Sequence, residues 1–205
     1  KIKKLAYSLV NKPIRIQISP KNPVAKNIDH KVAFIEMDDK RAFLEGIKRN
    51  VSLGWTQIHV PGGTYEDISI LEEIKSENNL HQRIYFMVSD GEPADRLLEE
   101  GPSIDPEHLL TVRAIKMYAD GALGSRGAAL LEKYSDYDGQ GVFIFLEEET
   151  KPRLAKALKK GIQIGTHAIG DHGNRVVLDW YEDAFEDARN NNNSLILQMG
   201  FWGFG

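Results

Sequence analysis

The stretch Glu147–His167, "EEETKPRLAKALKKGIQIGTH", predicts a helix followed directly by a strand. The charged part is typical of an amphipathic helix that ends at Gly161, a residue type that commonly ends helices. The apolar run "IQIGTH" is typical of a buried strand, and it ends on His167. A histidine at a strand end is usually a hydrogen-bonded core or loop residue, so a functional role for it requires partners elsewhere in the chain.

The same alternation of helix and strand runs through most of the chain. We predict helices at 38–54, 65–77 and 173–188, and strands at 55–60, 83–89 and 112–119. Strands that alternate with helices are typical of a parallel sheet, because the chain must cross back over the sheet between parallel neighbours. The sequence therefore predicts the α/β class, either as an open layer or as a (β/α) barrel.

The composition is that of an ordinary globular protein, and it excludes several kinds of function. The chain has 205 residues, of which 41% are hydrophobic and 27% charged, with a formal net charge of −4. This balance predicts no nucleic-acid partner and no membrane-binding basic patch. No run approaches the ~20 apolar residues that span a bilayer, and a cytoplasmic location is expected. The absence of cysteine excludes disulfides, a cysteine nucleophile and Cys-ligated metals.

The two ends of the chain do not follow the alternation. Residues 1–31 contain "KPIRIQISPKNP" (12–23), in which apolar and polar residues alternate between prolines, so we predict an irregular or β segment there. Residues 32–190 form the predicted α/β unit, and residues 191–205 are predicted to be a loop and an unassigned tail. The chain lacks an initiator methionine and ends on an aromatic and glycine-rich run. We therefore expect a fragment, or a chain whose missing pieces have been closed up.

Strand parity separates an aliphatic face from a face with functional groups, because side chains two residues apart in a strand share a side. One predicted face carries Ile58, Val60, Ile84, Phe86, Val88, Arg113, Ile115, Met117, Ile162 and Ile164. The other carries Gln57, His59, Tyr85, Met87, Ala114, Lys116, Tyr118, Asp120, Gln163, Gly165 and His167. In a barrel the first face packs against the helices, and the second surrounds a site at the carboxyl ends of the strands.

Lys116 is a polar residue in the middle of a strand that is expected to be buried. Since an unpaired buried ammonium costs several kcal/mol, the lysine either reaches solvent, pairs with a buried carboxylate or loses its charge. A neutral amine can add carbon dioxide and become a carbamate, an anionic oxygen ligand suited to bridging two divalent metals. That chemistry would place Lys116 and His167 around the same metal. In the structural interpretation, Lys116 reaches solvent or pairs with a buried carboxylate, and the histidines satisfy backbone groups instead.

Two colinear blocks carry a resemblance to a known family. They are "VRAIKMYADGALGSRGAALLEKYSD" (112–136) and "GIQIGTHAIGDHGNRVVLDWYEDA" (161–184). Together they resemble the amidohydrolase superfamily, specifically amidohydrolase family 3 and its YtcJ-like branch, which includes N-substituted formamide deformylases. The resemblance covers residues 38–188, with residues 54–63 similar to the second barrel strand and residues 83–89 similar to the third. It implies about strands 2 to 5 of a (β/α)8 TIM-type barrel, incomplete as given.

The resemblance implies two metal ligands. Lys116 stands where the family has a lysine ligand, commonly carboxylated, and His167 stands where the family has a metal-binding histidine. The family's His-x-His pair of the first strand, its sixth-strand histidine and its eighth-strand aspartate have no counterpart in this sequence. A catalytic metal needs about three protein ligands, so the chain supplies only part of the expected set.

The resemblance also implies a loop over the site. Asp120 and residues 121–126 would form this loop, and both Asp120 and Arg126 are candidate substrate contacts. His59 is expected at the mouth of its strand, in a substrate or supporting role. Asp171 is expected to fix the loop after His167 rather than to bind metal.

For the intact protein, the resemblance implies a metal-dependent hydrolase. One or two divalent ions, expected to be zinc, would activate a water that attacks the C–N bond of an amide or cyclic amide. An aspartate outside this sequence would pass the proton to the leaving amine. The expected partners are a small-molecule substrate and a second copy in a homodimer, and the fragment alone is expected to be inactive.

Two other interpretations stay open at this point. The first is a non-catalytic scaffold or binding protein with an amidohydrolase-like fold, which the missing ligands favour. The second is an unrelated α/β enzyme that binds an anion with "GALGSRG" (121–127) at a helix N-terminus. That stretch lacks the Gly-Lys-Ser/Thr ending of a nucleotide-binding loop, so we favour the hydrolase.

Overall fold

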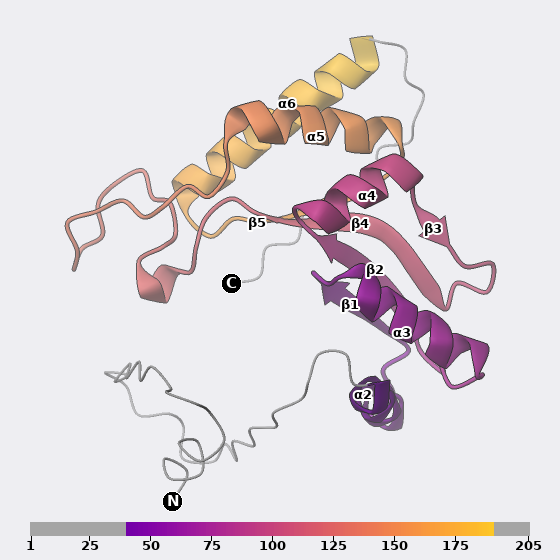
Figure 1. The fold of residues 1–205 in the computed structure, drawn as a ribbon. Helices are drawn as coiled ribbons and strands as arrows, with labels where there is room; N and C mark the ends of the chain where they lie inside the picture. The colour runs from indigo at the N-terminus through magenta and orange to yellow at the C-terminus, as the bar shows by residue number, and fades with distance from the viewer. Residues whose placement is uncertain (1–39, 191–205) are drawn as a thin grey trace, which may run out of the picture. The chain divides into compact units, whose positions relative to one another are not determined.

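In the computed structural model, which describes residues 40–190, a curled parallel sheet carries helices on one face (Figure 1). The segments predicted at residues 1–31 and 191–205 lie outside the described residues. The strands of the described part are β1 (Gln57–Pro61), β2 (Arg83–Ser89), β3 (Ser103–Ile104), β4 (Leu110–Tyr118) and β5 (Gln163–His167).

The four longer strands are parallel, in the order β1-β2-β4-β5. The short β3 pairs antiparallel with the first part of β4, and β5 pairs with the second part of the same strand. The predicted parallel sheet is therefore confirmed, with β3 as an addition. Its curvature is that of part of a TIM-type barrel (Figure 1).

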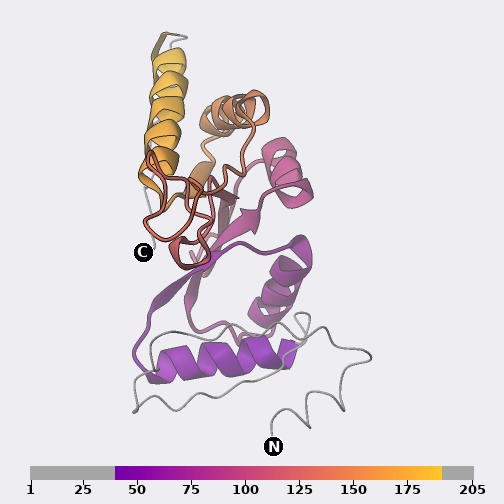
Figure 2. The ribbon, with the colours of Figure 1, turned by 90° about the vertical axis from the view of Figure 1, so that its left-hand side faces the viewer.

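The helices pack on the aliphatic face of the sheet. In the described part they are α2 (Lys40–Ser52), α3 (Tyr65–Ser76), α4 (Glu92–Glu100), α5 (Glu147–Lys159) and α6 (Asp171–Asn190). α5 and α6 lie side by side (Figure 2). Four of these helices confirm the sequence prediction, whereas α4 is an addition whose signals are Pro93 and acidic residues in its first turn. Within residues 40–190, every helix is too short or too polar to cross a membrane.

The hydrophobic core lies between these helices and the sheet. Phe86 and Val88 of β2 and Ile115 of β4 are fully buried, and they form one cluster with helix side chains. The helices contribute Ile47, Ile68, Leu71, Ile74, Leu97, Leu154, Ala157, Val177 and Trp180. The predicted aliphatic faces of β2 and β5 are thereby confirmed, because their isoleucines, phenylalanine and valine point into this cluster.

The strand β4 departs from strict alternation. Its register with β2 shifts by one residue, and Arg113 is the residue left without a partner there. The core side chains before and after this bulge are Leu110, Val112, Ile115 and Met117. The prediction that Arg113 shares the face of Ile115 is therefore wrong, because the bulge reverses the parity at that point. The Arg113 side chain instead donates a hydrogen bond to the carbonyl oxygen of Gly161 at 3.0 Å.

Candidate metal centre at the carboxyl ends of the strands

Lys116 lies on the inner face of β4, between Ser89 of β2 and Gly165 of β5. The residue is only 6% exposed. Its Nζ donates a hydrogen bond to the carbonyl oxygen of Met117 at 3.0 Å, and it lies 3.8 Å from the centre of the Tyr118 ring. Burial lowers the pKa of Lys116 from 10.5 to about 8, because the charged amine loses its hydration. In the folded protein, the Lys116 amine therefore becomes uncharged at mildly alkaline pH.

His167 is the last residue of β5, where it pairs with Tyr118 of β4. The ring centres of His167 and Tyr118 are 5.5 Å apart, and the His167 side chain is 20% exposed. Tyr118 thus contacts both the lysine amine and the imidazole. The structure brings Lys116 and His167 together at one edge of the sheet, while their binding of a metal stays a prediction. Tyr118 was absent from the predicted site, although its inward parity in β4 was a signal for it.

Asp120 follows β4 directly and is 1% exposed. Its Oδ2 accepts hydrogen bonds from the backbone N–H groups of Ala129 at 2.9 Å and Gly170 at 2.7 Å, and its Oδ1 accepts one from Ile169 at 2.9 Å. The carboxylate thereby joins the loop after β4 to the loop after β5. Its Oδ1 also lies 3.9 Å from Nε2 of His167. The predicted contact of Asp120 with substrate stays a prediction.

Arg126 lies in the loop after β4, at the end of the 3-10 helix η1 (Leu123–Ser125). Its guanidinium forms an ion pair with Asp136, with Nη2 2.7 Å from Oδ2. Its contact with substrate stays a prediction.

Asp171, the first residue of α6, has a structural role in the same region. Its Oδ1 accepts hydrogen bonds from the backbone N–H groups of Leu131 and His172, both at 2.9 Å. These bonds tie the start of α6 to the loop after β4, and the expectation that Asp171 fixes the loop after His167 stays a prediction.

The glycine-rich stretch 121–127 forms only the short helix η1, not the start of an α-helix. Gly121 and Gly127 lie close together, since a Cβ on Gly121 would be 3.1 Å from the Cα of Gly127. An anion-binding loop of the kind considered above needs an α-helix N-terminus. That interpretation of the stretch is therefore wrong.

His59 lies away from the other candidate residues. It occupies the middle of β1, pairs with Tyr85 of β2 and stacks on its ring with the centres 5.1 Å apart. Tyr85 precedes Ser89, the partner of Lys116, by four residues, or about 13 Å at about 3.3 Å per residue. The expectation that His59 lies at the mouth of its strand is therefore wrong, although its inward parity is correct. Its substrate role stays a prediction.

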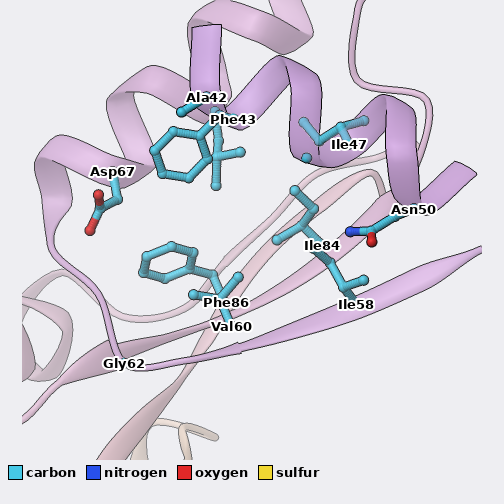
Figure 3. A pocket seen from close by; sticks show the side chains of 12 residues that line it. Ala42, Phe43, Ile47, Asn50, Ile58, Val60, Gly62, Asp67, Ile84 and Phe86 are labelled. Atoms are coloured by element: carbon cyan, nitrogen blue, oxygen red, sulfur yellow. The ribbon is translucent and has the colours of Figure 1, made fainter. Parts of the chain in front are cut away.

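An apolar pocket of about 390 Å³ lies on the opposite, helix-facing side of the sheet (Figure 3). Phe43 of α2, Ile58 of β1 and Phe86 of β2 line it. Its carboxylate, Asp67, is engaged in the capping box of α3, where it accepts a hydrogen bond from the N–H of Thr64 at 2.8 Å. The chemistry therefore concentrates on the other face, around Lys116.

The groups at the carboxyl edge fit part of a divalent-metal site. A lysine that loses its proton and an imidazole can both donate to a metal. Catalytic metals use about three protein ligands, and within residues 40–190 no three His, Cys, Asp or Glu residues are grouped so that they could hold a metal ion. Lys116 and His167 therefore fit as two ligands, and a full set requires residues outside the described part.

One protein family and two known proteins are similar to this chain in sequence. A family described as Amidohydrolase family matches residues 27–198. Protein LONG AFTER FAR-RED 3 of Arabidopsis thaliana is 25% identical over 165 residues, which are 76% of this chain and 27% of that protein. YtcJ of Bacillus subtilis strain 168, which carries an amidohydrolase name, is 43% identical over 70 residues, 34% of this chain and 13% of that protein.

Two solved structures are similar to this fold. An uncharacterized metal-dependent hydrolase from Pyrococcus furiosus has a TM-score of 0.64 and 27% identity, over 74% of this chain and 32% of that one. Its counterpart from Pyrococcus horikoshii OT3 has a TM-score of 0.63 and 25% identity, over 73% of this chain and 31% of that one. The chain spans less than a third of the length of each of these four proteins.

Proposed function

The chain belongs to the amidohydrolase family, and on this premise we propose that the whole protein is a metal-dependent hydrolase that cleaves an amide or cyclic amide C–N bond. Lys116 and His167 are two of its metal ligands. The observation that carries the proposal is the placement of a buried amine and an imidazole on one face, at the carboxyl ends of neighbouring strands. In barrels of this class, active sites lie at that end of the strands.

Lys116 binds the metal as a carbamate. Its neutral nitrogen attacks carbon dioxide, an N–C bond forms, and one proton is released, which leaves an anionic carboxylate at the end of the side chain. The pKa of about 8 supports this step, because the uncharged amine is the form that reacts. The small neighbours Ser89 and Gly165 support it as well, since neither opposes the added group with a bulky side chain.

His167 is the second ligand, and it ends β5 beside Tyr118, two residues further along the sheet than Lys116. A divalent cation held there, zinc in our proposal, would supply the Lewis-acid chemistry that activates water and polarises the scissile carbonyl. Arg126, in the loop after β4, contacts the small-molecule substrate. A homodimer remains a prediction for the whole protein.

Lys116→Ala and His167→Ala in the full-length protein test the proposal. We expect both to reduce kcat by on the order of 100-fold or more, since each removes a metal ligand. A short carboxylic acid such as propionate is expected to restore part of the activity of Lys116→Ala by donating oxygens to the metal. It will not restore His167→Ala, because an oxygen acid does not replace a positioned imidazole nitrogen.

Zinc content and turnover per folded molecule are the measurements, with Lys159→Ala as a control on an exposed helical lysine. Full zinc occupancy with normal turnover in either variant removes that residue from the site. A parent protein that binds no divalent metal would instead favour the non-catalytic scaffold.

A further inference from the structure

The carboxylate of Asp120 is a buried junction between two loops. Three backbone N–H groups, from Ala129, Ile169 and Gly170, donate to it at 2.7 to 2.9 Å. Two of these donors lie two and three residues after His167. Asp120 therefore fixes the backbone directly after β5, next to His167.

The packing around this carboxylate leaves it little freedom. A Cβ on Gly170 would lie 1.8 Å from the carbonyl oxygen of Ala129, and a Cβ on Gly173 would lie 2.7 Å from Oδ2 of Asp120. Both distances are shorter than real Cβ contacts, the first by far, so a side chain at either position would force its neighbours to shift. The glycines thus allow the two loops to approach until the backbone itself surrounds the carboxylate.

The same junction fixes the backbone of His167 and places a carboxylate near its ring. The N–H of Ala119, the residue before Asp120, donates to the carbonyl oxygen of His167 at 2.8 Å. On the side-chain end, Nε2 of His167 lies 3.9 Å from Oδ1 of Asp120. A histidine that binds a metal generally directs its other ring nitrogen to a carboxylate, which fixes the ring and strengthens it as a ligand.

We infer that Asp120 is a positioning residue for His167, which it orients through the two loops and through the negative charge that faces Nε2. The inference rests on the proposed function, in which His167 is a metal ligand. It gives Asp120 a role different from the substrate contact expected from the sequence. In this role Asp120 acts through His167 and touches neither substrate nor metal.

Asp120→Asn in the full-length protein tests the inference. The amide keeps the size of the side chain, but its NH2 group cannot accept from a backbone N–H, and the charge that faces His167 is lost. We expect the affinity of the metal-free protein for Zn²⁺ to fall by about tenfold or more, measured by competition with a chromophoric chelator.

Asp171→Asn is the matched control. It makes the same chemical change in a neighbouring carboxylate. The hydrogen bonds of Asp171 come from Leu131 and His172, and they do not involve His167. Because Asp171 is exposed and Asp120 is buried, we expect a smaller loss of thermal stability than in Asp120→Asn, and a Zn²⁺ affinity close to that of the parent. Equal losses of affinity in the two variants would overturn the inference, because Asp120 would then be structural only.

Gly173→Ala keeps the inference testable even if Asp120→Asn does not fold. The added Cβ displaces the Asp120 carboxylate without removing it, so Zn²⁺ affinity is again expected to fall. Zn²⁺ affinity equal to that of the parent in either variant overturns the inference.

His167→Ala, titrated in parallel, distinguishes failure of the inference from failure of the proposed function. If His167→Ala loses Zn²⁺ affinity and Asp120→Asn keeps it, the inference alone is contradicted. If His167→Ala keeps its Zn²⁺ affinity, the proposed function is contradicted.

Discussion

Lys116 is a buried cation whose contacts in the structure are an aromatic ring and a carbonyl oxygen. Lys75, by comparison, forms an ion pair with the buried carboxylate of Asp105. For Lys116, no carboxylate from residues 40–190 offsets the lost hydration, and burial is the cause of its lowered pKa. The structural alternative in which Lys116 pairs with a buried carboxylate is thus not realised in the described part of the protein.

The lowered pKa of Lys116 predicts a definite pH dependence of stability in the metal-free protein. Between pH about 8 and 10.5 the unfolded chain still binds the proton that the folded protein has released. The free energy of unfolding therefore rises with pH across this window. At pH values below the window, burial of the charged Lys116 amine lowers the free energy of unfolding by the full amount, roughly 3 kcal/mol.

The variant Lys116→Met removes this titration, so it is expected to be more stable than the parent at pH 7 and to lose the advantage by pH 10.5. Thermal unfolding of both proteins in the presence of a chelator measures the difference. If the unfolding temperatures of the parent and the variant changed with pH in parallel across this range, Lys116 would have its ordinary pKa.

At the scale of elements, β5 and α6 are joined by a buried hydrogen bond. The hydroxyl groups of Thr166 and Tyr181 are 2.6 Å apart, and both residues are more than 90% buried. Burial raises the pKa of Tyr181 to about 12. The folded protein therefore favours the neutral phenol of Tyr181. The stability that this preference contributes is lost as pH rises from 10 through 12. The bond fixes α6 against the strand that carries His167.

Tyr181→Phe is expected to destabilise the protein by about 1 to 2 kcal/mol, because it leaves the Thr166 hydroxyl buried without its partner. Denaturant unfolding measures the loss, and turnover is expected to change little because neither group faces the site. The double variant with Thr166→Val removes both polar groups. If the two single losses were simply additive in that double variant, the hydroxyl pair would not be coupled as the structure indicates.

At the scale of the whole molecule, the described sheet is curled and has two edges: β1 forms one, and β3 and β5, which both pair with β4, form the other. β1 pairs on one side only within residues 40–190, and β5 pairs there only with β4. Several large side chains of the loop between β4 and α5 are exposed as well, namely Leu123, Leu131, Tyr137, Val142, Ile144 and Leu146. Unpaired strand edges and exposed apolar groups together favour association between chains.

A fragment of residues 40–190 expressed alone is therefore expected to form oligomers or aggregates and to bind a hydrophobic dye. The full-length protein, measured under the same conditions by light scattering and dye fluorescence, is the control. A monomeric fragment that unfolds cooperatively would show that the half-barrel is stable with its edges open.

Local sequence pattern determined the class of fold, the parallel strands, four of the five described helices and the inward parity of Lys116 and His167. These features depend on the spacing of apolar residues along short segments, which the chain carries without reference to distant partners. The pattern missed α4, whose signals lie in its first turn, and it missed the bulge at Arg113, which reverses parity within β4.

The tertiary structure alone decided which polar groups meet. His59 has the predicted parity, yet the register of β1 on β2 pairs it with Tyr85. Tyr85 lies four residues before Ser89, the partner of Lys116. Asp120 bonds to Ile169 and Gly170, about fifty residues away in the chain. Such contacts depend on strand register and on how closely two loops approach. A hydrogen bond between distant residues leaves no periodic signal in the sequence, because only folding brings its donor and acceptor together.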